Sequence, residues 1–89
     1  MQIEVIRFSL AEGVDAVDFA RVNDRYQEDV AYQSGGLARR TVARDDAGRW
    51  LDIRLWSDAS SCDVGGDSTI RRQWDESIVV ESREIYKGL

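Results

Sequence analysis

Residues 37–56 read LARRTVARDDAGRWLDIRLW, and this stretch has the pattern of a β-hairpin. Two strand-like segments, 37–44 and 50–56, flank the short connection 45–49. Gly48 lies in that connection, where a loop of four or five residues commonly requires a positive φ angle. We therefore expect two antiparallel strands joined by a tight turn.

The second of these strands carries large side chains on both faces, because successive side chains of a strand point to opposite sides. One face is aliphatic and consists of Leu51, Ile53 and Leu55. The other mixes tryptophan with charge and consists of Trp50, Asp52, Arg54 and Trp56. Two tryptophans that bracket an acid–base pair suit a covered face whose polar groups pair across an interface. The sequence therefore predicts that Trp50, Arg54 and Trp56 form a dimer face.

Two further strands are expected near the ends of the chain, at 2–10 and 78–86, where β-branched residues are frequent. The first is apolar on both faces, with Ile3 and Val5 on one and Ile6, Phe8 and Leu10 on the other. A strand that is apolar on both faces has something packed against each of them. Helices can cover one face, and a second sheet must cover the other.

The segment 14–32 has the periodicity of an amphipathic helix. Apolar residues recur on one side at about 100° per residue, and they are Ala16, Phe19, Val22, Tyr26 and Val30. Asp15 can cap the first turn, and Gly35-Gly36 ends the helix. The segment 57–74 has a weaker pattern because Gly65 and Gly66 interrupt it. We expect a broken or shortened second helix with a loop near Gly65.

The expected order β-α-β-β-α-β is that of a ferredoxin-like α+β domain, with a four-stranded antiparallel sheet and both helices on one face. The 89 residues suit one such domain, 1–89. A chain this short buries only a little over ~60% of its unfolded surface, and the uncovered side of its sheet is apolar or aromatic. An exposed apolar patch of that size favours association. We therefore predict a homodimer.

Composition narrows the classes of partner and cofactor. The formal net charge is −5, and the basic cluster Arg39-Arg40 with Arg44 is interpreted as a solvated strand face, so no nucleic-acid partner is expected. The chain has no histidine and Cys62 is its only cysteine, which argues against a structural zinc site. We find no stretch with the roughly 18 apolar residues of a membrane span and no signal-peptide pattern. A cytoplasmic protein without metal or membrane contact is expected.

Residues 26–58, YQEDVAYQSGGLARRTVARDDAGRWLDIRLWSD, resemble a known group. A helix ending in Tyr-Gln, a Gly-Gly-Leu turn, an Arg-rich strand, a Gly hairpin and a strand closing on Leu-Trp-Ser are similar to those of the dimeric α/β-barrel superfamily. Within it, the chain resembles the antibiotic-biosynthesis-monooxygenase-like domains, and the element order extends this resemblance over nearly the whole chain. The resemblance implies a homodimer whose two sheets face each other as a barrel, with a small cavity in each subunit between helices and sheet.

In that superfamily such cavities host cofactor-free oxidation of polycyclic aromatic phenols, haem breakdown, or ligands not yet known. The haem-degrading members use a histidine, a first-strand asparagine and a second-helix tryptophan. This chain has no histidine, and the matching positions are Ile6 in the first strand and one near Gly66 in the second helix. A haem-degrading role is not expected, and no cofactor is predicted.

Three residues are candidates for a ligand pocket. Asn23 lies on the apolar helix face, where a buried amide needs partners that either a ligand or the backbone can supply. Tyr26 lies one turn later and Trp74 lies near the end of the second helix, where each can line a cavity or simply pack in the core. Without histidine the usual serine and cysteine relays are lacking, so no catalytic residue is assigned.

Two functions remain open. One is a cofactor-independent monooxygenase-like enzyme acting on a small aromatic molecule, indicated by the resemblance and by Asn23. The other is a non-catalytic dimeric module that binds a small ligand or a protein partner. The glycines that shorten the second helix indicate this alternative, because that helix normally helps to wall the cavity.

Overall fold

A computed structural model of the chain describes residues 1–57 and 68–89. The elements follow the order β1 (Gln2–Leu10), α1 (Ala16–Asp29), the 3₁₀ turn η1 (Ala31–Gln33), β2 (Leu37–Arg44), β3 (Trp50–Trp56), α2 (Ser68–Glu76) and β4 (Ile78–Lys87). This order confirms the predicted β-α-β-β-α-β sequence of elements. The expected loop near Gly65, the position near Gly66 and Cys62 lie outside the described residues.

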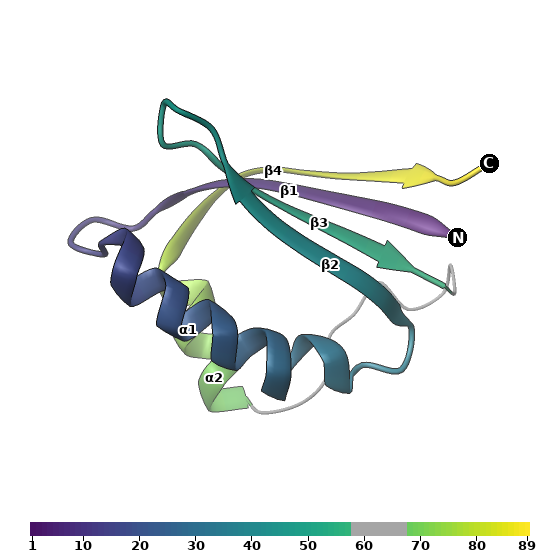
Figure 1. Ribbon diagram of the computed structural model, residues 1–89, viewed down its shortest axis with the longest axis horizontal. Helices are drawn as coiled ribbons and strands as arrows, with labels where there is room; N and C mark the ends of the chain where they lie inside the picture. Colours follow the sequence, from purple (N-terminus) through teal and green to yellow (C-terminus); the bar gives the residue numbers. More distant parts are fainter. Residues whose placement is uncertain (58–67) are drawn as a thin grey trace.

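The four strands form one antiparallel sheet in the order β2-β3-β1-β4. Both helices lie on the same side of this sheet, as Figure 1 shows. The predicted sheet and helix layer are therefore confirmed, and the arrangement is compatible with a ferredoxin-like fold. Within residues 1–57 and 68–89, no helix is long and apolar enough to cross a membrane.

Helix α1 begins where its sequence predicts. Asp15 is the N-cap, and its Oδ1 atom accepts a hydrogen bond from the backbone N–H of Asp18 at 2.8 Å. The regular helix ends at Asp29, and the chain continues through η1 rather than as an α-helix to residue 32. Phe19 and Tyr26 are the residues that α1 buries most deeply, which agrees with the predicted apolar side.

The β2–β3 hairpin also forms as predicted. Gly48 has a φ angle of 79°, the left-handed conformation that its place in the turn requires. Asp45 holds the turn, because its Oδ1 atom accepts hydrogen bonds from the backbone N–H groups of Ala47 and Arg49 at 2.9 and 3.0 Å. Figure 1 shows the hairpin standing out from the end of the sheet.

The hydrophobic core lies between the sheet and the helices. Its fully buried aromatic centre is Phe8 of β1 against Phe19 of α1, with ring centroids 5.6 Å apart. Trp50 of β3 packs on both rings, with centroids 6.1 and 5.0 Å away. Trp74 of α2 closes the group edge-on to Phe8 at 6.0 Å. Residues from both ends of the chain thus meet in one core, as a single small domain requires.

The two faces of the sheet are assigned differently from the expectation above. Trp50 packs on the α1 side chain Phe19, Arg54 lies over the α2 ring of Trp74, and Trp56 is fully buried. The residues expected at a dimer face therefore lie on the helix-covered side. Successive side chains of a strand point to opposite sides. The alternate side chains of β3 that begin at Trp50 therefore face the helices and contribute to the aromatic core.

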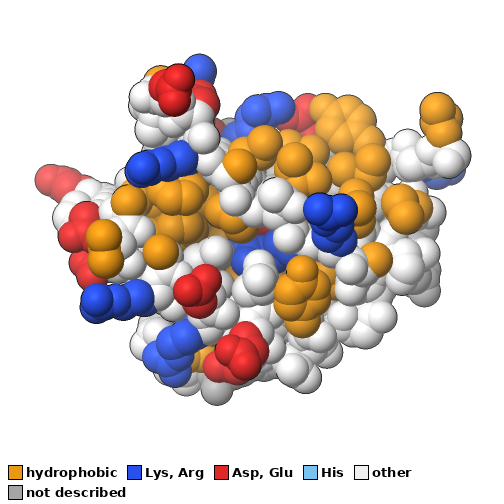
Figure 2. Space-filling view, in the orientation of Figure 1, with side chains coloured by type: hydrophobic (Ala, Val, Ile, Leu, Met, Phe, Trp, Pro, Cys, Tyr) orange, Lys and Arg blue, Asp and Glu red, His pale blue; other side chains and the backbone are white. Residues whose placement is uncertain are grey.

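The side of the sheet opposite the helices has no cover within the described subunit. We call its apolar centre the open sheet face, and its members are Ile3, Val5, Leu51, Ile53 and Leu55. The strand register places Ile3 opposite Leu55 and Val5 opposite Ile53, so these side chains form one continuous patch. All five are half-buried by their neighbours in the sheet. In Figure 2, hydrophobic side chains gather over the strands.

Candidate functional site

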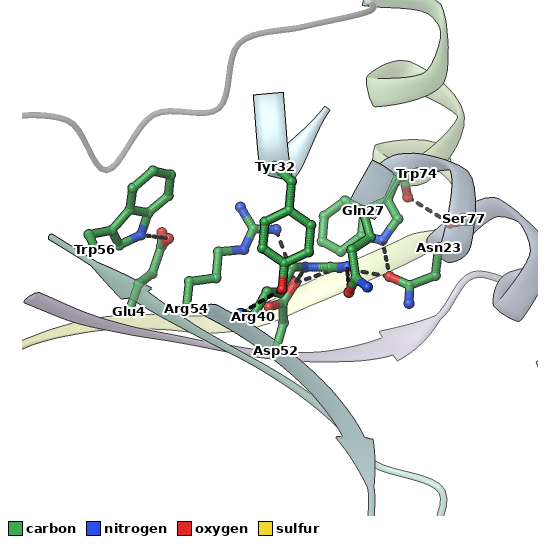
Figure 3. A network of polar contacts seen from close by, with 10 residues as sticks. All are labelled: Glu4, Asn23, Gln27, Tyr32, Arg40, Asp52, Arg54, Trp56, Trp74 and Ser77. Atoms are coloured by element: carbon green, nitrogen blue, oxygen red, sulfur yellow. Dashed lines mark hydrogen bonds and ion pairs between the residues drawn. The ribbon is translucent and has the colours of Figure 1, made fainter. Parts of the chain in front are cut away.

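A group of polar side chains lies between the sheet and the helices, and we call it the interior polar cluster. Its members come from α1, β2 and β3 and are Asn23, Gln27, Arg40, Asp52 and Arg54. Figure 3 shows these side chains converging from both layers, with Trp74 of α2 beside Asn23. Charged groups in such a place need partners, because burial removes their hydration.

Strand alternation and helix periodicity bring the cluster together. Asp52 and Arg54 are two residues apart on β3, so both point to the helix layer. Arg40 is opposite Arg54 in the β2–β3 ladder. Asn23 and Gln27 are about one turn apart on α1 and share the side that looks onto the sheet. Three regular elements therefore fix the positions of these side chains.

Asp52 is the centre of the cluster. Its Oδ2 atom accepts hydrogen bonds from Arg40 Nε at 3.1 Å, from Arg40 Nη2 at 2.9 Å and from Arg54 Nη2 at 3.0 Å. The side chains of Asp52 and Arg40 are completely buried, and that of Arg54 is 5% exposed. Two guanidinium groups thus share one carboxylate, which leaves one positive charge unbalanced inside the cluster.

The remaining donors of Arg40 connect the sheet to α1. Nη2 donates to Asn23 Oδ1 at 2.7 Å, and Nη1 donates to Gln27 Oε1 at 3.3 Å. Trp74 Nε1 donates to the same Asn23 oxygen at 3.2 Å. The acceptor oxygen of Asn23 is therefore engaged by two protein donors, one from the sheet and one from α2.

Tyr26 and Trp74 stack on each other beside the cluster, with ring centroids 4.5 Å apart and planes 15° from parallel. The guanidinium carbon of Arg40 lies 5.0 Å from the Tyr26 centroid and 5.7 Å from that of Trp74. The guanidinium carbon of Arg54 lies 5.4 Å from each of the two centroids. Aromatic faces attract cations at these distances, so the stacked rings offset part of the unbalanced charge.

Burial and the neighbouring charges shift three pKa values. Burial raises the pKa of Tyr26, and the nearby guanidinium groups oppose this only in part. Burial lowers the pKa of Arg40, against the attraction of Asp52. Burial also acts to lower the pKa of Arg54, but the charge of Asp52 and its hydrogen bond outweigh burial, so that this pKa is raised. At neutral pH Tyr26 is therefore protonated and Arg54 is charged.

In the described part of the chain, two fully buried side-chain atoms of the cluster have no hydrogen-bond partner, namely Asp52 Oδ1 and Arg54 Nε. Leaving a buried donor or acceptor unsatisfied costs about 1–3 kcal/mol. A guest oxygen that accepted a hydrogen bond from Arg54 Nε would remove that cost. Unsatisfied buried groups of this kind need a physical explanation, and these two atoms mark the place in the cluster where one is required.

A second buried polar group lies further along the sheet. Trp56 Nε1 donates to Glu4 Oε1 at 3.0 Å, and Arg83 of β4 forms an ion pair with Glu4 Oε2. Glu4 is only 2% exposed. Figure 3 places Glu4 and Trp56 on the far side of Arg54 from Asn23. Glu4 therefore has its own partners and stands apart from the interior polar cluster.

The structure brings together all three residues predicted for a ligand pocket. Asn23 and Trp74 are hydrogen-bonded, and Tyr26 stacks on Trp74. Sequence reasoning missed Arg40, Asp52 and Arg54 as members of the same site, and it had assigned Arg54 to a dimer face. Asp52 was detectable in principle, because a carboxylate two residues from an arginine in the middle of an apolar strand indicates a partnered, covered position.

No group of three or more His, Cys, Asp or Glu side chains able to hold a metal ion occurs among the described residues. A search against models of protein families found no match, and neither did a search of curated proteins. The function of this chain must therefore be argued from its own geometry.

Proposed function

We propose that this protein is a homodimer of the dimeric α/β-barrel type, similar to the antibiotic-biosynthesis-monooxygenase-like domains, and that it works as a binding module for a small aromatic ligand. In this proposal the open sheet faces of two subunits pack on each other. The supporting observation is the continuous aliphatic patch on the side of the sheet that no helix covers. Such a patch favours a closed, symmetric partner surface.

The oligomeric state is tested by light scattering at micromolar concentration. We expect a mass close to twice the 10.1 kDa of the chain. A mass that stays at that of one chain over this range would overturn the dimer while leaving the subunit fold untouched.

The ligand part of the proposal is carried by one observation, the buried and unpartnered Nε atom of Arg54 beside the stacked rings of Tyr26 and Trp74. A guanidinium group binds an acidic or phenolic oxygen through charge-assisted hydrogen bonds. Tyr26 and Trp74, which stack on each other and are only 2% and 3% exposed, give this atom an aromatic surrounding. The arrangement suits a small aromatic molecule that carries an acidic oxygen.

Binding is favoured over catalysis because the acceptor oxygens of Asn23, Gln27 and Asp52 are bonded to an arginine or, in the case of Asp52 Oδ1, fully buried. Tyr26 keeps its proton at neutral pH, since burial raises its pKa. Asp52 is held by two guanidinium groups through its Oδ2 atom. The acceptor of Asn23 is engaged by Arg40 and Trp74. A general base needs an accessible acceptor within hydrogen-bond reach of its substrate.

Cofactor-independent oxygenation of an aromatic phenol is the second candidate. Two buried guanidinium groups within 6 Å of aromatic faces favour it, because a fixed cation stabilises a phenolate as it forms. This candidate needs the substrate to lose its proton to solvent or on entry, since the cluster offers no base of its own.

The two candidates are separated with a panel of anthrone- and quinol-type phenols. Fluorescence of the tryptophans reports binding, and an oxygen electrode reports turnover. The proposed function predicts saturable binding without oxygen uptake above the uncatalysed rate, and weaker binding by Arg54→Gln. That variant keeps one arginine for Asp52 and should therefore fold. Oxygen uptake abolished by Arg54→Gln would establish the enzyme instead, and absence of binding across the panel would refute both.

A further inference from the structure

A recess lies where the β2–β3 hairpin leaves the sheet, away from the interior polar cluster, and we call it the hairpin hollow. Its volume is about 400 Å³, and side chains from β1, β2, β3 and β4 line it. Sites for small molecules typically measure roughly 300–1,000 Å³. The hollow contains neither Asn23 nor any other member of the interior polar cluster. It is therefore a separate candidate site.

Arginines dominate the charged lining of the hollow. Arg7, Arg44 and Arg49 face two carboxylates, Asp45 and Glu81. Arg7 also pairs with Glu84 outside the lining, so the charges in and around the hollow balance, in a chain whose net charge is −5. The attraction for an anion therefore depends on which of these arginines lacks a carboxylate partner.

The three arginines differ in whether their guanidinium groups already have a carboxylate partner. Arg49 Nε forms an ion pair with Asp45 Oδ2 at 2.9 Å, which belongs to the hairpin turn. Arg7 Nε lies 3.5 Å from Glu84 Oε1 at the surface, a long and exposed pair. Within the described residues, the guanidinium of Arg44 has no carboxylate partner and lies 5.6 Å from the ring centroid of Trp50. Arg44 is therefore the donor that is left for a guest.

Apolar surface lies next to that donor. Trp50, Leu51 and Ala43 line the same recess. Trp50 is half-buried, and one side of its ring is fixed against Phe8 and Phe19 of the core. A rigid aromatic wall beside a guanidinium group fits a planar apolar body that carries one acidic group.

We propose that the hairpin hollow is a binding site for a small aromatic carboxylate, with Arg44 pairing with the carboxylate and Trp50 contacting the ring. The carboxylate is held by the planar fork of Arg44, which offers two parallel N–H donors. Arg7 can approach from β1 because its pair with Glu84 is weak. The hollow shares no residue with the interior polar cluster, whereas Leu51 belongs both to the hollow and to the open sheet face.

The test uses 2-naphthoate as the probe and the full chain in its native oligomeric state, followed by isothermal titration calorimetry. We expect saturable binding, and Arg44→Gln should weaken it by about tenfold or more, as expected for the loss of a charge-assisted pair. Arg39→Gln is the matched control, because Arg39 is an exposed arginine of the same strand that does not line the hollow. It should leave the affinity unchanged.

Two further arms make the result decisive. Neutral 2-naphthamide should bind at least about tenfold more weakly than 2-naphthoate, because it lacks the charge that Arg44 pairs with. Arg54→Gln should leave the Arg44-dependent part of the 2-naphthoate binding unchanged, and any part that it removes belongs to the interior polar cluster. Equal affinity in Arg44→Gln and the unaltered protein, equal binding of the amide, or loss of the Arg44-dependent binding in Arg54→Gln would each overturn the hairpin hollow as the site.

Discussion

The two faces of β3 differ in a way that reverses the usual pattern of a sheet. The face turned to the helices holds two buried charges, Asp52 and Arg54, whereas the face turned away from them is aliphatic. An antiparallel sheet with one covered face normally buries its apolar residues and leaves polar ones outside. Here the covered side is partly polar and the uncovered side is apolar. The comparison teaches that the aliphatic side lacks its cover in the single subunit, which is why we propose that a second copy supplies it.

The largest effect is expected when a glutamate is placed on each face of β3 in turn. Trp56→Glu should lower the free energy of unfolding by more than about 3 kcal/mol, because it removes a fully buried ring and puts a second carboxylate beside Glu4. Ile53→Glu, on the open sheet face, should leave the subunit folded and raise the dissociation constant of the dimer by about tenfold or more. Urea denaturation followed by circular dichroism measures the first effect, and sedimentation velocity measures the second. Dissociation by Trp56→Glu without unfolding would reverse the assignment of the faces.

The next largest effect is expected at the centre of the interior polar cluster. Asp52→Asn keeps the shape of the side chain but leaves Arg40 and Arg54 without their shared counter-ion. The free energy of unfolding should fall by about 3–5 kcal/mol, as for other buried pairs that lose one partner. Asp46→Asn in the exposed hairpin turn is the control and should change stability by less than about 0.5 kcal/mol. Similar losses in both variants would mean that the cluster contributes little to stability.

The sequence was sufficient to predict the helices and strands. It was insufficient to predict which face of the sheet the helices cover. Hairpin and helix were predictable because Gly48 and the spacing of Phe19 and Tyr26 act locally. The orientation of β3 was not, because both of its faces carry large side chains and alternation alone does not say which one meets the helices. Arg40 was interpreted as a solvated residue, although it is completely buried.

The hydrogen-bond partners in the interior polar cluster could not be predicted from the sequence either. Asn23 and Trp74 are 51 residues apart, and only the packing of α1 on α2 brings them to 3.2 Å. The periodicity of α1 could place Asn23 on the right side of the helix, but it could not supply the donor. The three residues predicted for a pocket therefore lie together, whereas the three charged residues beside them, Arg40, Asp52 and Arg54, were not predicted as part of the same site.

The stability of the folded protein should depend on pH because Tyr26 is buried. Burial raises the pKa of Tyr26 above its ordinary value of 10.0, so above that pH the unfolded chain loses a proton that the folded chain retains. Stability is therefore complete below pH 10 and falls as the pH rises through the folded-state value. Tyr26→Phe should show a shallower fall above pH 10, measured from urea midpoints. Parallel curves for the two proteins would contradict a buried, protonated Tyr26.

The smallest effect is expected at the hairpin turn. Hydrogen bonds from the backbone and side chain of Arg49 lower the pKa of Asp45 below 3.8. The stabilisation by Asp45 is therefore present above that pH and is lost as the pH falls through the folded-state value. Asp45→Asn should lower the melting temperature slightly at pH 7 and should converge with the unaltered protein near pH 2. Asp46→Asn again serves as the control, and an equal shift there would assign the effect to charge alone.

The shared carboxylate of Asp52 also determines how the hairpin can align while the chain folds. A strand can slide along its neighbour only in steps of two residues if its side chains are to keep their sides. One such step would move Arg40 by roughly 6–7 Å along β3, away from Asn23 and Gln27. The buried guanidinium charge of Arg40 would then lack these partners. Because a misaligned pair of charges is costly, shifted alignments of β2 are disfavoured, and the observed alignment is the one in which the buried cations of the two strands are neutralised or stacked.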